Sequence, residues 1–314
     1  MHGKRDFRWF ILFMIALCAA VPALEACDGC GCTLARCGLS ESEAARRWFF
    51  DFTVEGQNWD KRDSAGAHTL HHQGHHVHNK TSETFYHHAL GFNATDRLTV
   101  LAELPYVRRL STEVDSHARL GHKEFSEGVG DLDVTLTWRF LRNEEGFLGL
   151  VGGVKFPTGS TTELNSGGDR FEPELQPGSG SYDGKTGLAF RRQAGPWRFQ
   201  GNALYTWKTE GDQEFEYGDA FSSYLVADRA VGRIAPGLRA GADLKFESAG
   251  KDREAGVRQA DSGGETLLAG PSVTWEAGPD VSLFGNFLFP VYQELGGVHQ
   301  EVDFAWNAGC KILW

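Results

Sequence analysis

Apolar and polar residues alternate one by one in segments that recur along most of this chain. In residues 131–140, Leu, Val, Trp and Phe fill the even positions, while Asp, Thr and Arg fill the odd ones. A period of two residues predicts a β-strand with one apolar face and one polar face. The last segment, residues 302–314, has apolar or small residues at every even position from Val302 and ends on Trp314. Such strands are typical of a wall between lipid and water.

The segments between the predicted strands alternate in length. Short turns rich in Gly, Pro, Asn and Asp alternate with longer polar segments at 59–83, 111–127, 158–180, 211–218, 249–264 and 293–299. Short periplasmic turns opposite longer outer loops are typical of outer-membrane barrels. A secreted β-sandwich would also have short strands, but it would leave the outward aromatic residues uncovered. The sequence therefore predicts an all-β protein, a transmembrane antiparallel up-and-down β-barrel of about 12 strands in the bacterial outer membrane.

The first residues have the composition of a secretory signal. A basic stretch, residues 4–8, precedes an uncharged apolar run over residues 9–17, and small residues follow. This order is that of a signal peptide, and the run is short for a membrane-spanning helix. We expect a signal peptide over 1–26, a Cys-rich periplasmic tail over 27–47 and the barrel over 48–314.

Composition narrows the class further. About 288 residues follow the expected signal peptide, enough for one large all-β domain. The mean hydropathy is −0.35, and no second stretch is apolar enough for a spanning helix, which excludes a helical membrane protein. A transmembrane β-barrel remains compatible with this low mean hydropathy, because its strands are apolar on only one face. The formal net charge of −11 disfavours nucleic acid as a partner.

If the apolar face of each strand meets lipid, the alternate face lines the interior. That face carries charges of both signs in near balance. The predicted pore-lining residues are Asp131, Asp133, Arg139, Lys155, Asp183, Lys185, Arg191, Arg198, Asp243, Lys245, Asp303 and Lys311. Opposed charges across a narrow lumen would hold water and admit small polar or amphipathic solutes. Alternatively, they would pair with one another and fill a purely structural barrel.

Two stretches on either side of a predicted hairpin carry a family resemblance. The first is Gly128-Val129-Gly130-Asp131, which leads into a strand, and the second is the Gly-Val-Lys-Phe-Pro-Thr-Gly of residues 153–159. In these stretches the chain resembles the meta-pathway phenol-degradation family of outer-membrane proteins. The resemblance implies an outer-membrane barrel that passes small molecules, aromatic ones among them. It supplies no catalytic residue, and the N-terminal Cys and His clusters are not part of the family pattern.

Four cysteines, Cys27, Cys30, Cys32 and Cys37, are concentrated in the expected periplasmic tail. The spacing C-x2-C-x-C-x4-C can bring several thiolates onto one soft ion, Zn(II) or Cu(I). An oxidising periplasm would instead pair four thiols as two disulfides. A lipid anchor on Cys27 is a further alternative, which Glu25 in the preceding positions disfavours.

Histidines are concentrated after the first predicted strand. Eight lie in residues 68–88, and the predicted metal ligands among them are His68, His71, His72, His75, His76 and His78. Imidazoles this close together bind Zn(II), Cu(II) or Ni(II), and a solvated polar loop is the alternative. The predicted topology places this run in a His-rich first outer loop, 59–83, across the membrane from the cysteines.

Together these features predict an outer-membrane channel or transporter for small solutes, with aromatic compounds or metal ions as candidates. The alternative is a metal-binding outer-membrane protein whose barrel is only an anchor. No cofactor is certain, and the candidate is a transition metal, Zn, Cu or Ni. The expected partners are outer-membrane lipid, the barrel-assembly machinery through the C-terminal strand, and a small-molecule solute. The chain has no G-x-S-x-G or H-E-x-x-H motif, so we do not expect an enzyme.

Overall fold

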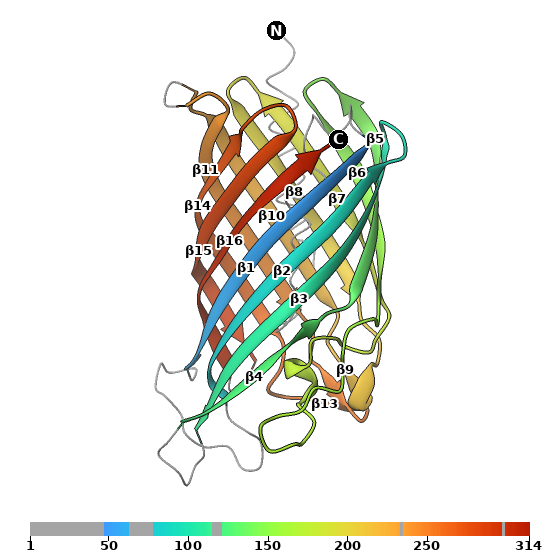
Figure 1. The fold of residues 1–314 in the computed structure, drawn as a ribbon, viewed down its shortest axis with the longest axis vertical. Coiled ribbons are helices and arrows are strands. Elements are labelled where there is room, and N and C mark those ends of the chain that lie inside the picture. Colours follow the sequence, from blue (N-terminus) through green and yellow to red (C-terminus); the bar gives the residue numbers. More distant parts are fainter. Residues whose placement is uncertain (1–46, 63–77, 115–120, 233–234, 297–298) are drawn as a thin grey trace.

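The protein is described by a computed structural model, which covers residues 47–62, 78–114, 121–232, 235–296 and 299–314. These residues form one closed antiparallel barrel of long, tilted strands (Figure 1). Among them, no helix is long and apolar enough to cross a membrane.

The wall consists of thirteen strand segments in one sheet. They are β1 (Trp48–Arg62), β2 (His78–Asn93), β3 (Leu98–Val114), β4 (Gly121–Val129), β5 (Leu132–Asn143), β6 (Gly146–Phe156), β7 (Asp183–Ala194), β8 (Trp197–Trp207), β10 (Ala220–Ala230), β11 (Leu238–Ala249), β14 (Gly264–Glu276), β15 (Val281–Leu295) and β16 (His299–Leu313). Because β4 and β5 pair one after the other with β3, the segments make twelve wall strands. The predicted twelve-stranded up-and-down barrel is confirmed.

The first and last strands meet and close the barrel. β1 pairs antiparallel with β16 along its length, from Phe49 opposite Leu313 to Arg62 opposite His299. At the end of this seam, Trp48 and Trp314 exchange two backbone hydrogen bonds, with N···O distances of 3.2 and 3.0 Å. Closure leaves no strand edge exposed to lipid, where an unpaired N–H or C=O group would have no water to bind.

Short turns join the strands at one end of the barrel, and long loops join them at the other (Figure 1). The loop end also holds the 3-10 helices η3 (Pro173–Leu175) and η4 (Asp212–Glu214), and a small sheet of β9 (Phe215–Glu216), β12 (Arg253–Glu254) and β13 (Val257–Arg258). The predicted alternation of short and long connections holds with one exception, since seven residues separate β10 and β11 at the turn end and only three separate β15 and β16 at the loop end. In outer-membrane barrels the short turns lie in the periplasm, so we assign the turn end of this barrel to that side.

Three predicted loops are too long. Residues 111–127 lie largely in strands, because β3 continues to Val114 and β4 begins at Gly121. Similarly, β1 and β2 extend into the loop predicted at 59–83, and β15 and β16 extend into the loop predicted at 293–299. These extensions are mostly polar, and their few apolar residues, such as Trp59 and Phe125, are too scattered for a sequence-based prediction to detect an alternating pattern.

Side chains alternate between the lipid face and the interior as predicted. On β5, Leu136 and Trp138 are about half exposed, whereas Thr135 and Arg139 are buried. Exposed tryptophans lie near the ends of the wall strands, at positions Trp48, Trp138, Trp197, Trp207, Trp275 and Trp314. These positions near the strand ends match the aromatic girdles that outer-membrane barrels have at the two membrane surfaces.

The predicted alternation of the terminal strand is wrong at its beginning. A β-bulge at Asp303 separates the pair Phe304–Asn58 from the pair Val302–Trp59. A bulge inserts one extra residue into a strand and so reverses the faces beyond it. Val302 is consequently buried in an inward apolar cluster rather than facing lipid, and Asp303 lies at the bulge itself.

The tightest packing at the closing seam is between Phe49 and Gly91. Phe49 is fully buried and packs with Ala89, Leu101 and Leu313 on the inner face. Gly91 lies opposite Phe49 on β2, and a Cβ atom there would lie 1.9 Å from Cζ of the Phe49 ring. Only glycine leaves room for this ring.

We expect Gly91→Ala to lower the free energy of unfolding by about 1–3 kcal/mol, because the added methyl group displaces Phe49. Gly152→Ala is the matched control, since a Cβ atom at Gly152 would meet nothing within 4 Å. Urea titration of the barrel in lipid vesicles, followed by tryptophan fluorescence, measures both. Equal destabilisation by the two substitutions would contradict this account of the seam.

Candidate functional site

The barrel wall is interrupted between β4 and β5, at Gly130 and Asp131. On the neighbouring strand β3, Pro105 has no N–H group to donate, while its carbonyl accepts a hydrogen bond from the Gly130 N–H at 2.9 Å. The Leu132 N–H donates to the hydroxyl of Thr158, at 2.8 Å. A side chain from the loop after β6 therefore replaces a wall hydrogen bond at this point.

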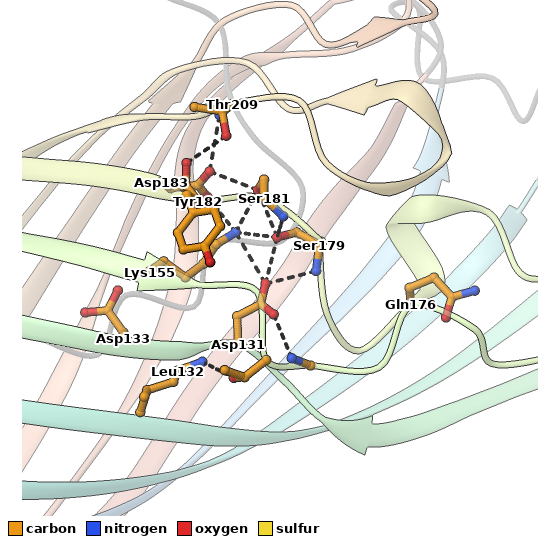
Figure 2. A network of polar contacts seen from close by, with 12 residues as sticks. Asp131, Leu132, Asp133, Lys155, Gln176, Ser179, Ser181, Tyr182, Asp183 and Thr209 are labelled. Atoms are coloured by element: carbon orange, nitrogen blue, oxygen red, sulfur yellow. Dashed lines mark hydrogen bonds and ion pairs between the residues drawn. The ribbon is translucent and has the colours of Figure 1, made fainter.

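The Asp131 carboxylate binds both ends of the loop formed by residues 157–182. Its Oδ1 accepts a hydrogen bond from the Gly159 N–H at 2.9 Å. Its Oδ2 accepts two from Ser179, from the N–H at 2.9 Å and from the hydroxyl at 2.7 Å. Figure 2 shows these contacts converging on the carboxylate. Asp131 is buried, so its charge is stabilised by these donors rather than by water.

Lys155 supplies the positive charge of the same cluster. Its Nζ lies 2.5 Å from Oδ2 of Asp183 and 3.4 Å from Oδ2 of Asp131. The hydroxyls of Ser179 and Ser181 accept hydrogen bonds from it at 2.5 and 3.2 Å (Figure 2). We call these five residues, Asp131, Lys155, Ser179, Ser181 and Asp183, the loop anchor.

Glycines bring the two ends of the loop against the broken strand. A Cβ atom on Gly159 would lie 2.7 Å from the carbonyl carbon of Gly130 and 2.7 Å from the Cα of Gly178. The Gly178 N–H also donates to the Ser160 carbonyl at 2.8 Å. The two stretches that carry the family resemblance thus meet at one place, and their shared role in the structure is to hold this loop.

The middle of the loop folds inward over the lumen. Arg109, on the inner face of β3, donates to the Gln176 carbonyl at 2.6 Å and to Glu83 at 2.7 Å. The Gln176 amide donates to the Phe171 carbonyl at 3.0 Å, and both Phe171 and Leu175 are buried. The loop therefore has its own small core at the outer mouth.

A second loop is tied to the first through Asp212. Its carboxylate accepts hydrogen bonds from the Thr161 hydroxyl and, at 2.8 Å, from Arg170. The hydrogen bond from Thr161 holds the pKa of Asp212 below its usual value, with Arg170 adding to the effect. The ionised Asp212 carboxylate therefore stabilises the folded protein. This stabilisation is complete above the usual pKa of a carboxyl group and is lost as the pH falls through the lowered pKa of Asp212.

Deeper in the barrel, one ion pair crosses the lumen. Nζ of Lys245 on β11 lies 3.1 Å from Oε1 of Glu55 on β1, although β14, β15 and β16 separate these strands in the wall. Both side chains are 7% exposed. β1 and β11 lie four positions apart in a wall of twelve strands, so the contact crosses part of the lumen instead of following the wall.

A second polar cluster lies beside this ion pair and joins β10, β11 and β15. The Tyr224 hydroxyl on β10 donates to Oδ2 of Asp243 at 2.6 Å. The Asn286 amide on β15 donates to the same oxygen at 2.7 Å and also contacts the Tyr224 hydroxyl. All three side chains are buried. We call the five residues Glu55, Tyr224, Asp243, Lys245 and Asn286 the cross-lumen band.

Two further histidines of the stretch 68–88, His87 and His88, lie in β2 and face opposite ways. His87 is buried on the inner face, and its Nδ1 lies 2.8 Å from Oε1 of Glu103, while its Nε2 makes no hydrogen bond. His88 faces outward, where its ring centroid lies 5.1 Å from that of Phe52. The two residues therefore do not share a ligand site.

The predicted pore-lining residues other than Asp303 point inward, but most of their charges are paired. Asp131, Lys155 and Asp183 belong to the loop anchor, and Asp243 and Lys245 to the cross-lumen band. The remaining contacts are Lys185 with Asp133, Arg198 with Asp228 at 2.6 Å, Lys311 with Asp51 at 3.8 Å, and Arg139 over the ring of Phe147 at 5.2 Å. Arg191 is also buried.

Sequence reasoning missed several polar residues of the interior. They are Glu55, His87, Glu103, Tyr224 and Asn286. For Glu55 a signal was available, because Asp51, Thr53, Glu55 and Gln57 continue the odd-numbered polar face of the first strand. For the other four residues, alternation in the sequence indicates which face of the strand each occupies. It does not indicate which inward side chain each one contacts.

The predicted metal ligands lie almost wholly outside the described residues. This holds for Cys27, Cys30, Cys32, Cys37, His68, His71, His72, His75 and His76, and for the expected signal peptide; His78 begins β2. In the part of the chain that the structure describes, no group of three or more His, Cys, Asp or Glu residues could hold a metal ion. Metal binding by these clusters stays a prediction.

The closed wall, the apolar outer face and the polar interior define an outer-membrane β-barrel protein. The chain belongs to the family described as "Putative MetA-pathway of phenol degradation", whose model matches residues 62–295. The family suggested by the two motif stretches is therefore confirmed. No curated protein matches the chain.

Solved structures of outer-membrane barrels are similar to this one. The COG4313 outer membrane channel of Pseudomonas putida F1 has a TM-score of 0.59 and 18% identity, and the alignment covers 86% of this chain and 96% of that one. A mutant of the TodX monoaromatic hydrocarbon channel has a TM-score of 0.46 and 10% identity, covering 92% and 96%. The transport unit of the Escherichia coli autotransporter AIDA-I has a TM-score of 0.48 and 11% identity, covering 90% and 96%. At 18% identity, the likeness to the P. putida channel shows the fold alone.

We expect Asp131→Ala to release the 157–182 loop, because its carboxylate binds both loop ends. Trypsin should then cleave after Arg170 at least about tenfold faster, which is a change of about 1.4 kcal/mol in the free energy of local opening. Asp133→Ala is the matched control, since Asp133 pairs with Lys185 and Thr135 on the wall. Cleavage as slow in Asp131→Ala as in the control would show that the carboxylate does not hold the loop.

Proposed function

We propose that this protein is an outer-membrane channel through which small amphipathic solutes, aromatic compounds among them, cross the barrel lumen. The observation that carries the proposal is the composition of the interior surface. On that surface, clusters of buried apolar side chains alternate with paired charges. A solute with an apolar body and a polar group finds a contact for each part along the same path.

Three inward apolar clusters make the interior partly apolar. The first is at the closing seam and contains Phe49, Ala89, Leu101 and Leu313. The second contains Val151, Ala189 and Leu204, with Phe147 packed against it. The third contains Leu268, Leu288, Val302 and Ala305, with Trp59 packed against it. Binding sites for small molecules are commonly lined in this way, by apolar surface with a few placed polar groups.

The comparisons support the same class of function. The matched family is described by a pathway of phenol degradation, and the P. putida structure with the same fold is an outer membrane channel. In the part of the chain that the structure describes, the buried apolar side chains form separate clusters and not one continuous core along the barrel. Among the described residues, each apolar cluster is bounded by buried polar side chains such as Asp51, Glu103 and Arg191.

Uptake of catechol by cells that lack their general porins tests the proposal. We expect expression of the folded barrel to raise the initial rate of uptake. In a cysteine-free background, Ser282→Cys places a thiol on the inner face near the turn end, and Leu283→Cys places one on the lipid face next to it. A bulky thiol reagent should lower the rate for Ser282→Cys by at least about half, because it narrows the path, and leave Leu283→Cys unchanged.

Two results would count against the channel. One is a folded, outer-membrane barrel whose expression leaves the uptake rate at the level of cells without it. The other is equal inhibition of the two labelled variants, since that would place the solute path outside the lumen.

A further inference from the structure

The Glu55–Lys245 ion pair joins two strands that are not neighbours in the barrel wall. Ion pairs between inward side chains of nearby strands, such as Lys185 of β7 with Asp133 of β5, stay along one side of the barrel. Lys245 instead reaches across to β1 and meets Glu55 at 3.1 Å. A solute moving along the lumen therefore has to pass this contact or separate it.

Neighbouring groups hold both charges in place. The Gln57 amide donates to the same Glu55 oxygen at 2.9 Å, and Lys245 also lies 3.4 Å from Glu247. Beside the pair, Tyr224 and Asn286 both bind Asp243 and join β10 to β15. The ion pair and this cluster lie next to each other, because Asp243 and Lys245 are successive inward residues of β11. The Glu55–Lys245 pair therefore acts as a polar partition across part of the lumen, and the Tyr224–Asp243–Asn286 cluster supports β11 beside it.

A buried pair of opposite charges controls the passage of ions in a simple way. While both charges are present, neither sign of ion meets a net attraction at this level. When one charge is removed, the other is left uncompensated in a site of low dielectric constant, where its field is strong. Rings of charged side chains determine ion selectivity in other channels by the same physics.

We propose that the Glu55–Lys245 pair is the narrowest point of the lumen and sets the ionic selectivity of the channel. This inference rests on the proposed channel function. On this account, Glu55 and Lys245 keep the conductance of the parent protein low. Because their charges compensate each other, the parent channel has no strong preference for cations or anions.

Single-channel recording of the full-length protein in planar bilayers, under a gradient of potassium chloride, tests the inference. We expect Lys245→Met and Glu55→Gln each to raise conductance by at least about threefold, because each opens the partition. Lys245→Met leaves the Glu55 carboxylate, so its reversal potential should shift toward cations. Glu55→Gln leaves Lys245, so its shift should be toward anions, and smaller because Glu247 remains nearby.

Controls separate selectivity from general loosening. The double variant Asp133→Asn with Lys185→Met removes an inward ion pair on one side of the wall without leaving a charge uncompensated, and we expect its conductance and reversal potential to stay those of the parent protein. The exchanged pair Glu55→Lys with Lys245→Glu restores a bridge and should restore the parent values. Electrophoresis of heated and unheated samples identifies any variant that does not fold, because a folded barrel changes its gel mobility on heating. If a single variant does not fold, the exchanged pair provides the test in its place.

The inference is overturned if both single variants keep the parent conductance, or if their reversal potentials shift in the same direction. It is also overturned if the double variant Asp133→Asn with Lys185→Met raises conductance as much as Lys245→Met does. These results leave the channel function intact as long as solute uptake persists. If instead every folded variant and the parent protein neither conduct nor take up solute, the proposed channel function itself fails.

Discussion

The constraint on which this structure depends is the pairing of backbone polar groups in a medium without water. Hydrocarbon offers no partner for an exposed N–H or C=O group, so a sheet that crosses a membrane has to close on itself. The pairing of β1 with β16, completed by Trp48 and Trp314, meets that requirement. Closure then divides the side chains into a lipid face and an interior.

The interior has to accommodate the charges that closure places there. Buried charges are costly unless each has a partner. The loop anchor and the cross-lumen band both solve this problem, but with different consequences. In the loop anchor, Asp131 compensates for an interruption of the wall and fixes a loop over the outer mouth. In the cross-lumen band, Lys245 of β11 reaches Glu55 of β1 past three intervening strands, so satisfying these charges also obstructs part of the path.

Much of the fold follows from the sequence, because a period of two residues reports directly which face of a strand meets lipid. The twelve strands, the alternating turns and loops, and the inward position of residues such as Lys245 and Asp243 could be predicted in this way. The bulge at Asp303 could not, since an inserted residue changes the phase without changing the composition of the strand. The polar extensions of β3 and β4 also lack the apolar face on which the prediction depends.

The site was less accessible to prediction than the fold. Alternation places Glu55 and Lys245 on the inner face but says nothing about which inward residues meet across the lumen. The family motif was visible in the sequence, whereas its physical role required the structure. Gly130, Gly159 and Gly178 allow close backbone contact, and the Asp131 carboxylate accepts hydrogen bonds from N–H groups at both ends of the loop.

The division into a lipid face and an interior is the central claim of this account, and two native tryptophans near the loop end report on it. Trp207 is half exposed on the outer face of β8, while Trp59 packs against an inward cluster with its indole nitrogen buried. Fluorescence of single-tryptophan versions in vesicles of brominated lipid measures contact with the acyl chains directly. The account predicts strong quenching of Trp207 and little quenching of Trp59. Equal quenching of the two, or stronger quenching of Trp59, would contradict it.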